Sequence, residues 1–167
     1  MKKSFDTKKM VTLSAIIAVA MILSYVESLI PAFVAVPGVK LGLSNIATMF
    51  ALYTLGWPYS ICVSLIRVFL SSYLFAGFTS LIYSFSGAVL ALTVMILLSR
   101  IKALSTVVIS IAGAVAHNVG QVIAVCLVME NAYIAFNLAP LLLTGTIAGV
   151  VIGLASAALI ERTKKYL

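Results

Sequence analysis

The chain has 167 residues, of which 63% are hydrophobic and 9% are charged, a composition that excludes an ordinary soluble protein and indicates a polytopic membrane protein. Residues 1–167 have room for six spans of roughly 20 residues, each crossing roughly 30 Å of hydrocarbon, so a single integral membrane domain is expected. The net charge of +7 does not indicate nucleic-acid binding, because the basic residues gather at the two ends and in one internal loop.

The first apolar stretch, 10–30, follows four lysine residues and could be mistaken for a secretory signal. It is longer than a signal-peptide core of roughly 7 to 15 residues, and further apolar stretches follow it. We therefore predict that it is an uncleaved first helix.

Pro, Gly and polar breaks divide the rest of the chain into five more apolar stretches. Pro31 and Pro37 bound the first loop, and the tripeptide 56–58, Gly-Trp-Pro, predicts a tight reversal between the second and third stretches. Each stretch must be helical, because lipid offers no hydrogen-bond partner to free backbone groups. The sequence therefore predicts an all-α membrane protein, a bundle of six transmembrane helices over residues 10–30, 41–57, 59–76, 79–99, 105–128 and 138–160.

The distribution of Lys and Arg predicts the orientation of this bundle. With the amino terminus inside, nine basic residues fall on the cytoplasmic side, whereas the outer loops hold only Lys40. Both termini are therefore predicted to be cytoplasmic, in a multi-pass protein of the cell membrane. The nine residues are Lys2, Lys3, Lys8, Lys9, Arg100, Lys102, Arg162, Lys164 and Lys165.

Small residues recur at four-residue spacing on three of the predicted helices. Such ridges let helix backbones approach closely in lipid, so they indicate either packing within the bundle or docking to a second membrane subunit. The first helix also carries Ser14 and Ala18 near its cytoplasmic end. The ridges are Ala20, Ser24 and Ser28; Ala112, Ala116, Gly120 and Ala124; and Gly145, Gly149, Gly153 and Ala157.

Few ionisable residues interrupt the apolar part of the chain. Arg67 lies near the middle of the third helix, where a charge costs at least roughly 2.5 to 3.5 kcal/mol, so it must be paired or hydrated. It either forms an ion pair with Glu27, at the outer end of the first helix, or faces an anionic solute. Lys40 begins the second helix and either reaches headgroup phosphates or binds an anion together with the positive end of the helix dipole.

A cluster of polar side chains is predicted on the fifth helix. His117 and Gln121 share one face, and Asn118 lies beside them. A single histidine is more often a core imidazole, but the additional donors and acceptors favour contact with a solute. Glu130 and Asn131, in the last outer loop, are interpreted as loop residues in water.

The sequence does not indicate an enzyme, a metal site or a cofactor. It has no acidic cluster to hold Mg²⁺ on a diphosphate and no Walker loop. Cys62 and Cys126 fall in apolar stretches with no disulfide or metal-ligand spacing. The acids of the chain are Asp6, Glu27, Glu130 and Glu161.

A resemblance to a known family rests on residues 37–46, Pro-Gly-Val-Lys-Leu-Gly-Leu-Ser-Asn-Ile, and 117–121, His-Asn-Val-Gly-Gln. They resemble the bacterial Gx transporter family, also catalogued as heptaprenyl diphosphate synthase component I. The likeness spans nearly the whole chain, and the Lys-Leu-Gly-Leu-x-Asn stretch, which ends at Asn45, is its most specific part.

That family is similar to the S components of energy-coupling factor (ECF) transporters, six-helix proteins that bind a vitamin-like solute from outside. In such systems a transmembrane T component and a pair of cytoplasmic ATPases power uptake, and small residues on the first helix dock the S component. The resemblance implies a docking role for Ser14 and Ala18, which depart from an Ala-xxx-Ala form.

The leading hypothesis is a membrane subunit that captures a small, anionic or amphipathic solute from the outer side for uptake with energising partners. The alternative is a non-catalytic accessory subunit of heptaprenyl diphosphate synthesis, and a third is a structural assembly factor. The sequence does not identify the solute. Its polar contacts are predicted to be Glu27, Lys40, Asn45, Arg67, His117, Asn118 and Gln121.

Overall fold

The structure is a computed structural model and describes residues 7–29 and 42–164. Every regular element in these two ranges is a helix, which confirms the predicted all-α class. The α-helices are α1 (Thr7–Leu29), α2 (Asn45–Thr54), α3 (Trp57–Ser71), α4 (Phe78–Leu98), α5 (Thr106–Val128) and α6 (Leu138–Thr163), joined by a π-helix, η1 (Ser72–Ala76), and a 3₁₀-helix, η2 (Ala132–Asn137).

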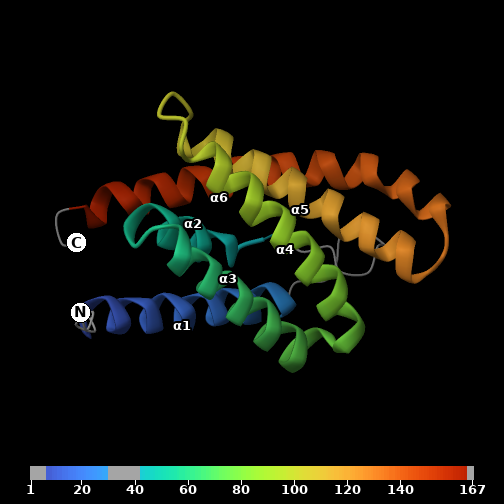
Figure 1. Ribbon diagram of the computed structural model, residues 1–167, viewed down its shortest axis with the longest axis horizontal. Helices are drawn as coiled ribbons and strands as arrows, with labels where there is room; N and C mark the ends of the chain where they lie inside the picture. Colours follow the sequence, from blue (N-terminus) through green and yellow to red (C-terminus); the bar gives the residue numbers. More distant parts are fainter. Residues whose placement is uncertain (1–6, 30–41, 165–167) are drawn as a thin grey trace, which may run out of the picture.

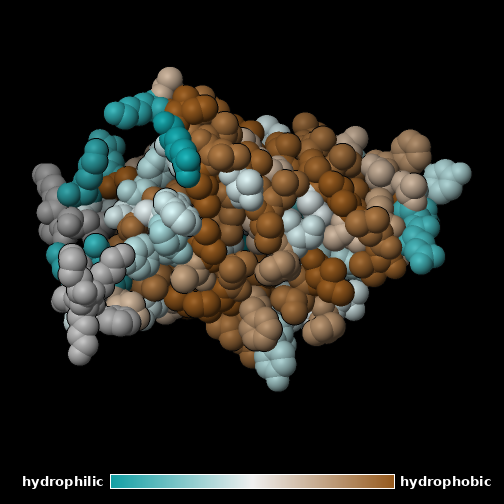
Figure 2. Space-filling model, viewed as in Figure 1, coloured by the Kyte–Doolittle hydropathy of each residue, from teal (hydrophilic) through white to brown (hydrophobic). Residues whose placement is uncertain are grey.

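Within the described ranges, five helices are long and apolar enough to cross a membrane, with α3 counted through its continuation to Phe75. Their bounds lie within a few residues of the predicted spans. Space-filling representation shows an apolar band over the middle of the visible face and hydrophilic side chains at both ends of the molecule (Figure 2). This is the surface of a multi-pass membrane protein.

The second helix differs from the prediction of a span over 41–57. At 1.5 Å per residue, the 10 residues of α2 extend about 15 Å, which is half of the roughly 30 Å that a span requires. Gly42 has a positive φ of 77°, and the Asn45 amide donates to the Gly42 carbonyl in a turn. The left-handed backbone at Gly42 does not continue a helix, so α2 begins only at Asn45.

Two hydrophobic clusters hold α2 in place between its neighbours. Ala47 and Ala51 pack with Ile16 and Ala20 of α1 and Val63 of α3. On another face of α2, Met49 and Leu52 join a second cluster, whose other members are Ala91, Leu92, Met95 and Ile109 from α4 and α5. The short helix is therefore buried inside the bundle.

The predicted ridges of small residues on α5 and α6 pack inside the bundle. A Cβ atom at Gly120 would lie 2.9 Å from the Gly87 Cα atom of α4, and one at Gly149 would lie 2.8 Å from the Ile111 Cα atom of α5. Real Cβ atoms essentially never come within 3.0 Å of such atoms, so these contacts need glycine. This arrangement confirms internal packing as the role of the glycines at 120, 145, 149 and 153.

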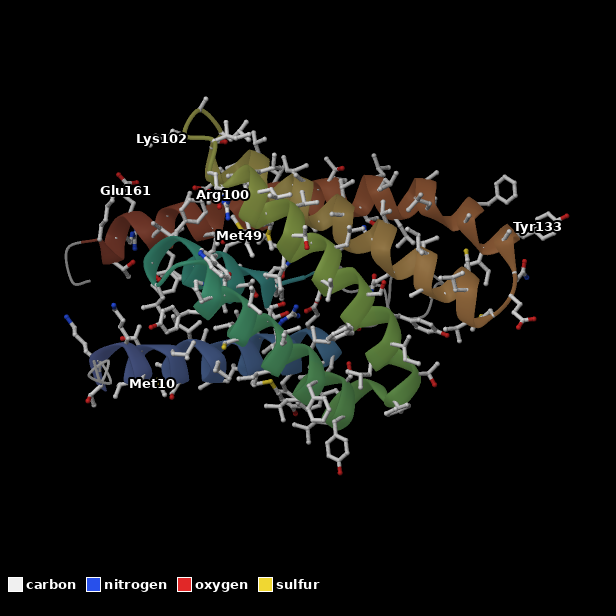
Figure 3. All side chains as sticks on the ribbon, viewed as in Figure 1. Met10, Met49, Arg100, Lys102, Tyr133 and Glu161 are labelled. Atoms are coloured by element: carbon white, nitrogen blue, oxygen red, sulfur yellow. The ribbon has the colours of Figure 1, made fainter. Side chains whose placement is uncertain are left out.

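One end of the bundle collects the basic segments. The start of α1, the end of α6 and the turn between α4 and α5 lie at the same end (Figure 1). Arg100 and Lys102 lie toward this end, whereas Tyr133 marks the opposite end (Figure 3). We call the first the basic end.

Candidate functional site

A cavity of about 50 Å³ lies inside the bundle, and all six α-helices or the segments that join them contribute to its wall. Polar and small side chains make up most of the lining. The described lining residues are Glu27, Gly42, Asn45, Arg67, Val68, Ser71, Ser84, Ala114, His117, Asn118, Gly145, Ala148 and Ile152. We call this the central cavity.

The start of α2 is held between an acid and a base on the central cavity. The Glu27 carboxylate of α1, which is 5% exposed, accepts a hydrogen bond from the Gly42 amide. Arg67 of α3, which is 8% exposed, donates from Nη1 to the Ser44 hydroxyl at 2.6 Å. The segment that leads into the short helix is therefore held by both charged side chains, by Glu27 at the Gly42 backbone amide and by Arg67 at the Ser44 side chain.

Burial disfavours the charged Arg67 guanidinium, and the attraction of the Glu27 carboxylate offsets part of this cost. Removing one partner of a buried pair strands the other charge and typically costs about 3–5 kcal/mol. The Arg67 guanidinium is not fully satisfied, however. Its Nε has no hydrogen-bond partner among the described residues.

On the side of the central cavity that α5 and α6 form, Asn118 links these two helices. Its Nδ2 donates to the Leu141 carbonyl at 2.6 Å, and a Cβ at position 145 would approach this nitrogen to less than 3.0 Å. The absence of a side chain at Gly145 therefore lets the Asn118 amide reach the backbone of α6. His117 lines the cavity one position earlier on α5.

Gln121 is not among the described residues that line the central cavity. It is buried at the α4–α5 contact, where a Cβ at Gly87 would lie 2.8 Å from its Cγ. Gly87 also approaches His117, because a Cβ at Gly87 would lie 2.7 Å from the His117 carbonyl oxygen and 3.0 Å from its Cε1. His117 and Gln121 therefore both meet Gly87 of α4, as residues on one face of α5 would, and His117 also lines the central cavity.

Of the seven predicted contact residues, five line the central cavity and Lys40 falls outside the described residues. The five come from α1, α2, α3 and α5 and are Glu27, Asn45, Arg67, His117 and Asn118. Sequence reasoning did not place Ser71, Ser84 or Gly145 at the site, although it included Gly145 in the packing ridge of the last helix. Ser71 follows Arg67 by one helical turn and was detectable from that spacing, whereas Ser84 carries no such signal.

The predicted docking residues, Ser14 and Ala18, are both exposed on α1. Beside them is a second hollow of about 260 Å³ with an almost wholly apolar lining from α1, α2 and α6. We call it the apolar groove. Its lining residues are Thr12, Ala15, Ile16, Val19, Ile46, Ala47, Phe50 and Leu159.

Comparison with known proteins gave one family. A family model described as heptaprenyl diphosphate synthase component I matches residues 16–159, which is most of the chain. No curated protein and no solved structure matches.

Proposed function

The chain belongs to the heptaprenyl diphosphate synthase component I family, and from this premise we propose that it is a solute-binding membrane subunit of the S-component type. It captures a small, anionic or amphipathic solute in the central cavity, and partner subunits energise uptake. Arg67, His117, Asn118 and Asn45 supply the polar contacts, and Glu27 lies beside them. Lys40 and Gln121 are the further predicted contacts.

One observation carries this proposal, namely that Arg67 and His117, from different helices, line the same cavity. Ionisable side chains in a membrane are costly and usually face a partner or a cavity that serves function. If Arg67 and His117 served only to hold helices together, each would be buried in a separate helix–helix contact. Convergent polar groups around one hollow are instead typical of a small-molecule site.

We propose that the solute enters from the outer side and that the basic end is cytoplasmic. The excess of Lys and Arg at the basic end supports this orientation. The exposed Ser14 and Ala18, with the apolar groove beside them, would then face a T component that works with an ATPase pair.

The proposal is tested by ligand binding to the protein in mild detergent. Mass spectrometry of the purified protein identifies a co-purified solute, and calorimetry or thermal shift against a vitamin and isoprenoid panel measures affinity. We expect tight binding that Arg67→Ala combined with His117→Ala abolishes. The matched control is Arg100→Ala, an exposed arginine outside the cavity, which should leave binding unchanged. Unaltered binding in the double variant would refute the site.

The name of the family favours a second candidate, a non-catalytic accessory subunit of heptaprenyl diphosphate synthesis. The word component implies a partner, which would be the catalytic chain. Affinity purification from native membranes separates the two candidates. Recovery of an Asp-rich prenyltransferase supports the accessory role, whereas recovery of an ATPase pair and a T component supports uptake.

A further inference from the structure

We infer, on the basis of the proposed solute-binding function, that Glu27 sets the charge of the bound head group. The central cavity accepts a compact head with a single negative charge, such as a carboxylate, and rejects a diphosphate. Three features of the described residues support this inference: the free edge of Arg67, the charge balance at the start of α2 and the size of the cavity.

The Arg67 guanidinium has one edge left for an anion. Its Nη1 is committed to the Ser44 hydroxyl, whereas Nε lacks a partner among the described residues. Arginine commonly binds a carboxylate with two parallel N–H donors, and Nε supplies one donor of such a fork. A buried N–H left unpaired is costly, so an incoming carboxylate oxygen would satisfy it.

The charge balance of the described lining, which does not include Lys40, leaves room for about one negative charge. Arg67 and Glu27 are the charged side chains among the described residues of the lining, and they cancel when His117 is neutral. The start of α2 adds about half a positive charge from the helix dipole. A single carboxylate reverses this small surplus, whereas a diphosphate would leave a large uncompensated negative charge in a medium of low dielectric constant.

The volume of the cavity points to the same class of head group. At roughly 10–15 Å³ per water-sized position, a cavity of about 50 Å³ holds only a few such positions. A carboxylate has three heavy atoms and fits this space. A diphosphate has nine and does not.

Glu27 imposes this limit, because its carboxylate already balances the charge of Arg67. The charge of Glu27 can also be removed without loss of its contact with the backbone. In Glu27→Gln the amide oxygen can still accept the hydrogen bond that the Gly42 amide donates to the carboxylate. The substitution is nearly isosteric and raises the net charge of the described lining by one, although it also removes the carboxylate that attracts the Arg67 guanidinium. The preferred head group should therefore shift from one negative charge to two.

The experiment measures protection of the full chain by acetate, inorganic phosphate and pyrophosphate at constant ionic strength, from thermal unfolding in detergent. We expect acetate to protect the unsubstituted protein and pyrophosphate not to do so. In Glu27→Gln the affinity for phosphate should rise about tenfold, because one repulsive charge near the site is gone. Glu130→Gln removes an exposed acid outside the cavity and should change neither the affinity for acetate nor the affinity for phosphate.

A second variant keeps the test decisive if Glu27→Gln does not fold. Asn45→Asp adds a negative charge to the lining with almost no change of shape and should lower acetate affinity about tenfold. Stronger protection by pyrophosphate than by acetate, or anion affinities that neither variant changes, would overturn the charge limit. A ligand from the vitamin panel would still uphold the proposed function in that case.

Discussion

The contact between Gly145 and Asn118 provides a quantitative test of how the wall of the central cavity is built. In Gly145→Ala, the new methyl group meets the Asn118 Nδ2 at less than 3.0 Å, whereas its other neighbours, the Asn118 Cγ and the Ala114 carbonyl, stay at 3.4 and 3.7 Å. The collision is therefore confined to one amide group. That group must turn away and give up its bond to the Leu141 carbonyl.

The expected cost follows from these contacts. Overpacking in a tight core costs about 1–3 kcal/mol, and the loss of one hydrogen bond between membrane helices averages about 0.6 kcal/mol. We therefore expect Gly145→Ala to lower the free energy of unfolding by about 2 kcal/mol. In an Asn118→Ala background the same substitution should cost less than about 0.5 kcal/mol, because the obstructing amide is absent.

The assay is a double-mutant cycle on unfolding in mixed micelles. The control is Gly149→Ala, whose methyl group would lie 2.8 Å from the Ile111 Cα atom, a backbone contact that truncation of Asn118 does not relieve. Its cost should be the same in both backgrounds. An equal cost of Gly145→Ala with and without Asn118 would refute the reasoning.

Three further outcomes are expected. Gly87→Ala should destabilise the fold by at least as much as Gly145→Ala, since its methyl group would lie 2.7 Å from a backbone carbonyl of α5; thermal unfolding measures this, and a neutral effect would contradict the packing. Ser44→Ala should cost about 1–3 kcal/mol of unfolding free energy, because it removes a partner of the buried Arg67 guanidinium. The orientation is tested with single cysteines in a cysteine-free protein and an impermeant thiol reagent. A cysteine at position 133 (Tyr133→Cys) should react in intact cells, whereas one at position 102 (Lys102→Cys) should react only after permeabilisation. The reverse pattern would invert the proposed topology.

The sequence was sufficient to predict the long helices but not the short one. Apolar runs bounded by Pro, Gly and polar residues placed α1, α4, α5 and α6 within a few residues of their observed bounds. The start of α2 depends instead on the left-handed backbone of Gly42. Glycine adopts many conformations, so its presence in an apolar run does not reveal which one the fold selects.

The residues of the site could be predicted from the sequence, but the contacts between them could not. Placing the Arg67 charge in the membrane costs free energy, which indicated that Arg67 must have partners, and Glu27 was among those expected. Its hydrogen bond to Ser44 depends on the depth at which α2 begins, which sequence spacing does not give. Helical periodicity placed Gln121 with His117, and Gly87 of α4 approaches both residues, but the close approach of α4 is a property of the three-dimensional packing.

The short α2 explains why the polar groups lie where they do. Backbone outside a regular helix is tolerated at membrane depth only where it is buried in protein or lines a cavity. Gly42 lines the central cavity, and Ser44 is buried. A helix that began nearer the surface would place its positive end among the headgroups. Because α2 begins beside Glu27 and Arg67, the positive end of its dipole lies inside the bundle, where the low dielectric constant strengthens its effect on an anion. The short α2 thus leaves buried backbone groups that need polar partners, and its dipole supplies part of the electric field that a solute in the central cavity would experience.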